Sequence, residues 1–343
     1  MLNVVWKDST HTAFSQLLSP LPRLLIPTGT LTLCRGGIIQ INRISNEART
    51  HKYFDFERVG DNIFRAVNLS TGIQQSKNAA YGGITLAQAL AAAENTTAME
   101  FKPHSVHFFF ILSVDTTVPV DYHVQSLRDG RSFCTRSVQA IQKGKVVSSL
   151  QASFNVVEPD SCIHQLPSPS VKQPHECPDL TETSTDLLNR ISRGKDKGSR
   201  NAREVIAKHS QVDTTLFEFE VRCTDTDSFL GTDETSRKFF FWVRAKMSLS
   251  HSDERLHRWM TAFASDFLPA GVILRPHSRN DFTPSMVFSL DHVMHFHHHE
   301  IKADEWLLYE VESTTAGSGR GFAQCRIRRA DGKLLVSFSQ EIL

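Results

Sequence analysis

The chain has 343 residues, of which 40% are hydrophobic and 22% are charged, an ordinary composition for a globular protein long enough for two modest domains. Its formal net charge of +1 argues against nucleic acid or a strongly acidic surface as the main partner. The six cysteines include no Cys-x-x-Cys pair, so neither a zinc site nor a disulfide framework is indicated, and no apolar run is long enough to span a membrane.

Residues 1–53 differ from the rest of the chain. Pro20, Pro22 and Pro27 interrupt Leu-rich pieces, and arginines outnumber acidic residues. Because these prolines break any continuous amphipathic helix, we assign the segment no fold and treat it as an N-terminal extension of unknown structure. A targeting extension is the alternative.

The hydrophobic pattern becomes regular from Phe54 onward. It predicts a short strand near residues 56–67 and an Ala-rich helix near 83–95. Four further strands are expected near residues 104–112, 119–127, 132–142 and 145–156. A helix followed by consecutive strands is typical of an α+β fold, so we predict a first unit over residues 54–157.

Residues 158–212 interrupt this regularity with five prolines, followed by a basic run from Arg190 to Lys208. The composition favours a solvated linker, although basic side chains are also suited to the phosphates of a ligand.

The first pattern recurs over residues 213–343. A helix is expected near 253–267, and strands are expected near 215–223, 238–247, 285–297, 305–314, 321–329 and 333–342. Short motifs recur as well: Arg131-Ser132-Phe133 followed by Gly144-Lys145 corresponds to Arg320-Gly321-Phe322 followed by Gly332-Lys333. The chain therefore resembles two copies of one unit, with a site where the copies meet.

The first predicted helix opens with Gly82-Gly83 and continues with alanines around much of its circumference. Small side chains suit a helix held inside a curling sheet, the arrangement of a hotdog unit. The two glycines leave backbone N–H groups that a ligand can approach closely, and such a helix end suits a carbonyl oxygen gaining negative charge.

The second predicted helix carries one apolar stripe, formed by Leu256, Trp259, Met260, Phe263 and Phe267. Asp266 lies at the edge of this stripe, so its carboxylate should be partly shielded. Taken alone, it is better interpreted as a rim carboxylate that a backbone group satisfies.

Two strand residues change this interpretation. Gln340 interrupts the apolar face of the last predicted strand, and a buried amide needs hydrogen-bond partners. Ser289 shares a strand face with Asp291, and its hydroxyl can donate and accept at once. Each of these residues alone is more often structural.

Together with a series of ordered motifs, these features resemble the acyl-CoA thioesterase II family, whose members are double hotdogs. The resemblance runs from about Phe54 to the last residue and is weakest through the predicted linker. Its motifs are Tyr81-Gly82-Gly83 with Gln88-Ala89-Leu90, His104-Ser105-Val106-His107, Leu127 to Phe133, Gln151-Ala152-Ser153-Phe154, Phe263-Ala264-Ser265-Asp266, Leu290-Asp291-His292 and Glu305 to Tyr309.

The resemblance implies an α+β double hotdog that hydrolyses acyl-CoA thioesters in lipid metabolism. A catalytic Asp, hydroxyl and Gln that hold a water map to Asp266, Ser289 and Gln340, and the oxyanion or substrate-binding positions are Gly82, Gly83 and His107. It implies no cofactor and no metal, acyl-CoA as substrate, and a homo-oligomer.

Four positions depart from the family pattern. Ser289 stands where members carry Thr, Val293 replaces a common Ser, and His298-His299 replaces a usual Arg-Pro. Since only a hydroxyl is required at position 289, these departures concern ligand detail more than reaction type.

In the predicted reaction the Gly82–Gly83 helix end polarises the thioester carbonyl, while Asp266, Ser289 and Gln340 hold and deprotonate a water. No covalent acyl-enzyme is needed, and the chain contains no Gly-x-Ser-x-Gly motif of the α/β-hydrolase type. The products are a free acid and coenzyme A.

Three alternatives remain. His295, His297 and His299 alternate and are suited to chelating a metal, although an exposed His-rich strand end is favoured. A hotdog hydratase typically has His five residues after its Asp, but position 271 is Gly. A non-catalytic acyl-CoA binding protein would not need competent side chains at all three thioesterase positions.

We expect reduced thiols and a cytoplasmic protein. The alternative is the peroxisome, although the sequence finishes with Glu341-Ile342-Leu343 rather than a Ser-Lys-Leu type signal.

Overall fold

The computed structural model describes residues 52–72, 78–194, 217–226, 238–249, 254–267, 269–280 and 284–343, together with Ala207 and Phe282. Residues 44–343 form one compact unit, and everything below concerns this unit. The predicted N-terminal extension falls almost wholly outside the described residues, as do parts of the predicted linker and the start of the strand expected at 215–223.

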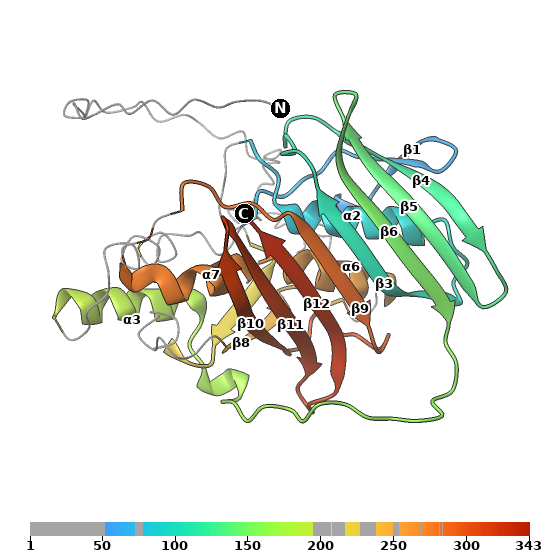
Figure 1. The fold of residues 1–343 in the computed structure, drawn as a ribbon. Coiled ribbons are helices and arrows are strands. Elements are labelled where there is room, and N and C mark those ends of the chain that lie inside the picture. The colour runs from blue at the N-terminus through green and yellow to red at the C-terminus, as the bar shows by residue number, and fades with distance from the viewer. Residues whose placement is uncertain are drawn as a thin grey trace, which may run out of the picture. The chain divides into compact units, whose positions relative to one another are not determined.

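Twelve strands of the described residues form one antiparallel sheet, in the order β1-β2-β4-β5-β6-β3-β9-β12-β11-β10-β8-β7 (Figure 1). The strands are β1 (Glu57–Gly60), β2 (Ile63–Ala66), β3 (Phe101–Phe110), β4 (Val120–Asp129), β5 (Phe133–Gln142), β6 (Lys145–Val156), β7 (Phe219–Cys223), β8 (Lys238–Ala245), β9 (Asp291–Phe296), β10 (Leu307–Gly317), β11 (Arg320–Arg329) and β12 (Leu334–Ile342). The second six strands repeat the order of the first six in reverse, so the sheet shows the internal repeat that the motifs predict.

The two halves of the sheet join through β3 and β9. These strands pair antiparallel, from Ser105 opposite His295 to Phe109 opposite Asp291. Along β3 the buried residues Val106 and Phe108 alternate with the exposed residues His107 and Phe109, so one face of this seam is core and the other is open.

Two helices, α2 (Gly82–Glu94) and α6 (Glu254–Ser265), pack against each other on the core side of the sheet (Figure 1). Every residue of α2 from Gly83 to Glu94 is buried, which accounts for its many alanines: side chains larger than a methyl group would separate the helix from its neighbours. The apolar stripe of α6 is core as predicted, with Met260 and Phe263 fully buried.

The helices run antiparallel, and the glycines of α2 allow the close contact. A Cβ on Gly83 would lie 2.3 Å from the Phe263 carbonyl oxygen, and one on Gly82 would lie 2.7 Å from Asp266 Oδ2. The beginning of α2 therefore packs against the end of α6, and Gly is required there because any side chain would force the helices apart.

Most predicted elements agree with the structure within a few residues, and the exceptions are local. The segment 56–67 is a hairpin of two strands, and the strand expected at 285–297 is confined to Asp291–Phe296. The predicted linker contains a 3-10 turn (Pro174–Glu176) and α3 (Leu180–Ser192). Two further elements were not predicted, α7 (Pro269–Leu274) and a 3-10 helix (Arg275–Asn280).

The start of helix α3 could have been predicted from the sequence. Its N-cap Asp179 accepts a hydrogen bond from the Glu182 backbone N–H at 2.7 Å, and the Glu182 carboxylate accepts from the Asp179 N–H at 3.1 Å. This reciprocal capping box is encoded as Asp-x-x-Glu ahead of an amphipathic run, and the proline count of the segment obscured it.

Candidate active site

Three separate elements bring the predicted catalytic residues together. Asp266 directly follows α6, and Gln340 lies on β12 with its side chain toward the core. Ser289 precedes β9 and forms an isolated bridge with Ile342, two residues beyond Gln340 on the neighbouring strand. The end of a helix and the edges of two paired strands therefore meet at one point.

The three side chains are hydrogen-bonded to one another. The Gln340 amide nitrogen donates to Asp266 Oδ1 and to Ser289 Oγ, each at 2.5 Å. The Ser289 hydroxyl donates to the same Asp266 oxygen at 3.0 Å. Gln340 is fully buried and Asp266 is 8% exposed, so the cluster sits almost out of water.

Burial dominates the electrostatics of Asp266. It raises the pKa of this carboxyl to about 6, while the hydrogen bonds from Gln340, Ser289 and the Gly83 backbone N–H act in the opposite direction. All three of these donors are neutral. A carboxylate of this kind is ionised at neutral pH and is basic enough to accept a proton from water.

The N-terminus of α2 faces this carboxylate. The Gly83 N–H donates to Asp266, and the positive end of the α2 dipole favours the ionised form. The sequence predicted that the glycine N–H groups point at a substrate carbonyl. In the structure the Gly83 N–H instead donates to the Asp266 carboxylate.

His107 does not join the cluster. It is exposed on the open face of β3, opposite the core face on which the helices pack, and its Nε2 lies 3.2 Å from Ser105 Oγ. Its ring meets that of His295 edge to face, with 6.1 Å between centroids. His107 and Asp266 therefore lie on opposite sides of the sheet, and a role of His107 in substrate binding stays a prediction.

The alternating histidines near residue 297 are not on one strand. Strand β9 ends at Phe296, so only His295 has a strand position, and His297 Nε2 contacts Ser337 Oγ at 2.9 Å. Over the described residues, no three or more His, Cys, Asp or Glu side chains are placed to share a metal ion.

Sequence reasoning missed two buried residues beside the cluster. His292 is fully buried on β9, and its Nε2 lies 3.0 Å from the hydroxyl oxygen of Ser265. Its ring stacks on Phe338, with 5.1 Å between centroids and 19° between planes. The Asp291-His292 pair was visible as a motif, and strand alternation from Met294 would have placed His292 on the core face.

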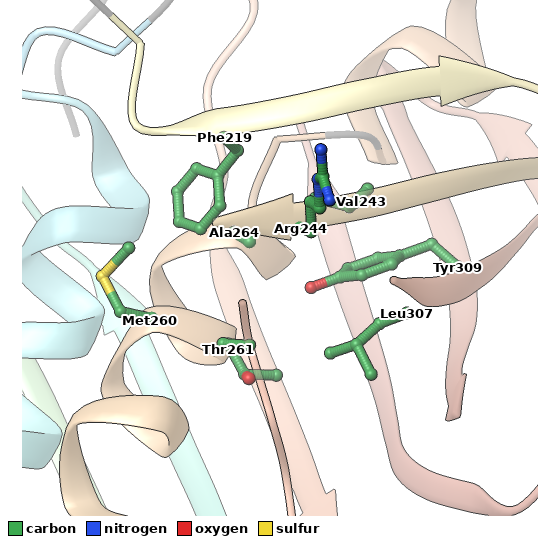
Figure 2. Close-up of a pocket in the computed structure, with 9 residues that line it drawn as sticks. Phe219, Val243, Arg244, Met260, Thr261, Ala264, Leu307 and Tyr309 are labelled. Carbon is green, nitrogen blue, oxygen red and sulfur yellow. The ribbon is translucent and has the colours of Figure 1, made fainter. Parts of the chain in front are cut away.

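A narrow crevice, with essentially no space for a water molecule, lies between α6 and strands β7, β8 and β10. The Tyr309 hydroxyl points toward α6 across this space (Figure 2). Its lining is Phe219, Val243, Arg244, Met260, Thr261, Ala264, Ala303, Leu307 and Tyr309. None of the three clustered residues lines the crevice.

Two family models match this chain. The model described as "Acyl-CoA thioesterase N-terminal domain" matches residues 72–155, and the one described as "Acyl-CoA thioesterase C-terminal domain" matches residues 195–343. Acyl-coenzyme A thioesterase 8 of Mus musculus is 34% identical over 261 residues, which cover 76% of this chain and 78% of the relative.

Other relatives and a solved structure agree with these matches. Peroxisomal acyl-coenzyme A thioester hydrolase 1 of Saccharomyces cerevisiae is 24% identical, covering 76% of this chain and 84% of the relative. The crystal structure of acyl-CoA thioesterase II TesB2 from Mycobacterium marinum superposes with a TM-score of 0.66 at 28% identity, covering 86% of this chain and 97% of that one. Within the part of the chain that the structure describes, each helix is too short or too polar to span a lipid bilayer.

Proposed function

The chain belongs to the acyl-CoA thioesterase II family of double-hotdog thioester hydrolases, and we propose that Asp266, Ser289 and Gln340 activate a water that hydrolyses acyl-CoA. The observation that carries the proposal is the convergence of a neutral amide and a hydroxyl on one buried carboxylate oxygen. Each of these three residue types can hold a water, and only the carboxylate can act as its base.

The reaction follows from the charges. Asp266 takes a proton from the water, the water oxygen forms a bond to the thioester carbon, and the carbon–sulfur bond then breaks. The proton held by Asp266 is the one that the departing coenzyme A sulfur needs, so the carboxylate is regenerated and no outside reactant is consumed. The Ser289 hydroxyl and the Gln340 amide orient the water and the base throughout.

We place the substrate carbonyl at the N-terminal turn of α2. Gly82 packs directly against Asp266 and Phe110, since a Cβ at this position would lie 2.7 Å from an atom of each, so a thioester carbonyl that reaches Asp266 also lies beside this turn. The partial positive charge of the helix end favours both the Asp266 carboxylate and an oxyanion formed beside it.

A thiol-release assay tests the proposal. Supplied with acyl-CoAs of different chain lengths, the wild-type chain should release free thiol, and Asp266→Asn should lower kcat by on the order of 10²-fold or more because an amide cannot act as the base. Asp291→Asn is the matched control: its carboxylate lies nearby but accepts the Glu341 backbone N–H at 2.8 Å, outside the cluster. Equal rates for the wild-type chain and Asp266→Asn would overturn the assignment.

The same experiment separates the alternatives. A hotdog hydratase would consume an enoyl-CoA without releasing thiol, and a non-catalytic binding protein would bind acyl-CoA and leave it intact. The missing His at position 271 and the complete Asp, Ser and Gln set both favour hydrolysis.

Location and assembly are separate predictions. We expect a cytoplasmic homo-oligomer, with the peroxisome as the alternative location, since a yeast relative is named as peroxisomal. Imaging a fusion that leaves the last residue free, beside a peroxisomal marker, tests the location, and light scattering of the purified chain tests the assembly.

A further inference from the structure

His292 is a buried polar group that the proposed reaction does not use. It lies on the core face of β9, next to β12, where Phe338 pairs with Met294 and Ser339 with Val293. Continuing this register by one position places His292 beside Gln340. Burial lowers the pKa of His292 to about 3, and a hydrogen bond that the ring donates to the Gln340 side chain acts against that shift.

Two polar atoms at this junction lack a partner with full hydrogen-bond geometry. They are His292 Nδ1 and Gln340 Oε1, both buried, on neighbouring strands. A buried atom without a partner carries a large desolvation penalty, so such atoms are rare unless they serve each other. A hydrogen bond with the Gln340 side chain also raises the pKa of the His292 ring, against the effect of burial.

Only one tautomer satisfies both atoms. A neutral imidazole carries a single N–H. With that hydrogen on Nε2, the lone pairs of Nδ1 and of Gln340 Oε1 would face each other. With it on Nδ1, the ring donates to Gln340 Oε1, and Nε2 accepts when the Ser265 hydroxyl turns its single hydrogen from the Ala262 carbonyl oxygen, 2.9 Å away, to Nε2 at 3.0 Å.

The orientation of the Gln340 amide matters for the site. Its nitrogen lies 2.5 Å from both Asp266 Oδ1 and Ser289 Oγ. If the amide rotated by half a turn, its oxygen would face the carboxylate, and two acceptors would repel each other at that distance. A donor on the far side of the amide prevents this rotation.

We propose that His292 is a positioning residue, held by Ser265, that donates to Gln340 Oε1 and keeps the amide nitrogen directed at Asp266 and the water. The proposal rests on the proposed function of the Asp266 cluster. It adds a chain of contacts from the end of α6 through β9 to β12, and Ser265 and Asp266, adjacent in sequence, stand at its two ends.

Two substitutions at one position test it. His292→Phe keeps a ring to stack on Phe338 but removes the donor, whereas His292→Asn retains an N–H near the place of Nδ1. His292→Phe should lower kcat by roughly 10–10²-fold with little change in KM, since a misdirected group of this kind typically costs that much. His292→Asn should recover most of the loss.

The pH profile distinguishes positioning from simple destabilisation. Donation by Gln340 lowers the pKa of Asp266, so losing it should move the acid limb of kcat/KM to higher pH in His292→Phe and leave it near the wild-type position in His292→Asn. Burial holds the pKa of Tyr81 well above the ordinary value, and the Asp266 charge raises it further, so Tyr81 stays neutral beside this carboxyl.

The possible results distinguish a positioning role of His292 from a structural one. Equal losses in both variants, or a loss in His292→Phe with an unmoved acid limb, would show that His292 only supports the fold. If His292→Phe does not fold, Ser265→Ala gives the second arm, because without its hydroxyl Nε2 has no donor and the acid limb should move in the same direction. Full activity in Asp266→Asn would refute the proposed function itself, whereas a dead Asp266→Asn with unaffected His292 and Ser265 variants would refute only the positioning role.

Discussion

The two ends of the α2–α6 helix pair each contain a buried carboxylate, and the partners of the two carboxylates differ. At one end Asp266 is surrounded by neutral donors from Gln340, Ser289 and Gly83. At the other end Glu94, fully buried, receives the Arg258 guanidinium on Oε1 and the Trp259 indole N–H on Oε2 at 2.8 Å. The same helix pairing therefore supports two different electrostatic arrangements.

The difference indicates a division of labour between two copies of one unit. A guanidinium neutralises Glu94, and both carboxylate oxygens are occupied, so this end fastens α2 to α6. Asp266 has no cation among the partners that act on its pKa, and its carboxyl therefore exchanges a proton near neutral pH. The Glu94 end is suited to holding the helices together, and the Asp266 end is suited to proton transfer.

The strands of the two units differ in the same way as the two ends of the helix pair. Aligning Gly144-Lys145 with Gly332-Lys333 places Ala152 at the position of Gln340. Ala152 pairs with Val106, so the first unit has apolar side chains where the second has Gln340 beside His292. A duplicated unit can lose its polar cluster at one end because the other end retains it.

The largest effect is expected at the structural end. Glu94→Gln should lower the free energy of unfolding by about 3–5 kcal/mol, because it leaves the Arg258 charge buried without its counter-charge. Chemical denaturation measures this effect. Glu254→Gln is the control at the same helix end, since its exposed carboxylate pairs with Lys102 at 3.1 Å and lies 3.9 Å from the same Arg258, and an exposed pair contributes about 1 kcal/mol or less. Equal effects of the two substitutions would show that the buried pair does not fasten the helices.

At the end of the helix pair that contains Asp266, we expect a substitution to raise the free energy of unfolding rather than to lower it. Burial raises the pKa of Asp266 in the folded chain to about 6 from an ordinary 3.8, so the folded state binds this proton more tightly than the unfolded state does. The ionised carboxylate therefore costs stability, and the cost develops as the pH rises from about 4 to 6. Asp266→Asn should raise the free energy of unfolding at pH 7.5 by about 1–3 kcal/mol while removing activity.

Denaturation of both chains at pH 4 and pH 7.5 checks the sign. The difference in stability between Asp266→Asn and the wild-type chain should be small at pH 4 and large at pH 7.5. A variant that is less stable than the wild-type chain at pH 7.5 would contradict the view that this end is held in a strained ionised state for catalysis.

Close contact between the helices at the catalytic end gives the next prediction. In Gly83→Ala the new methyl would lie 2.3 Å from the Phe263 carbonyl oxygen and 2.6 Å from Tyr81 Cε1. We expect a loss of about 1–3 kcal/mol from overpacking, together with lower kcat because the start of α2 moves away from Asp266. Gly271→Ala is the control, since the methyl that it adds would have no other atom within 4 Å and Ala is the better helix former.

The sequence predicted much of this arrangement, for identifiable reasons. Period-two and helical patterns located most strands and both central helices, and the stripe that ends at Phe267 placed Asp266 at its edge. The ion pair of Glu94 with Arg258 joins residues 164 positions apart, and no local pattern encodes such a contact. The direction of the Gly83 N–H likewise depends on how two distant helices meet.

His107 illustrates a signal that was present and was not used. Val106 and Phe108 are apolar neighbours in a strand, so alternation alone places His107 on the face away from the core. A family motif marks residues that recur together, whereas the face of the strand decides which of them lie beside the core.

The smallest effect is expected at Ser289, where the family resemblance implies a threonine. Ser289→Thr keeps the hydroxyl that donates to Asp266 at 3.0 Å and adds a methyl group that restricts rotation about χ1. Since the position is only half-buried, we expect the methyl to be tolerated, and kcat should stay within about threefold of the wild-type value, a change below about 1 kcal/mol in activation free energy. Ser289→Ala, which removes the hydroxyl and leaves the Gln340 amide with one acceptor fewer, should lose clearly more. If threonine is as damaging as alanine, the hydroxyl of Ser289 does not act on the water, and the catalytic end of the helix pair rests on Asp266 and Gln340 alone.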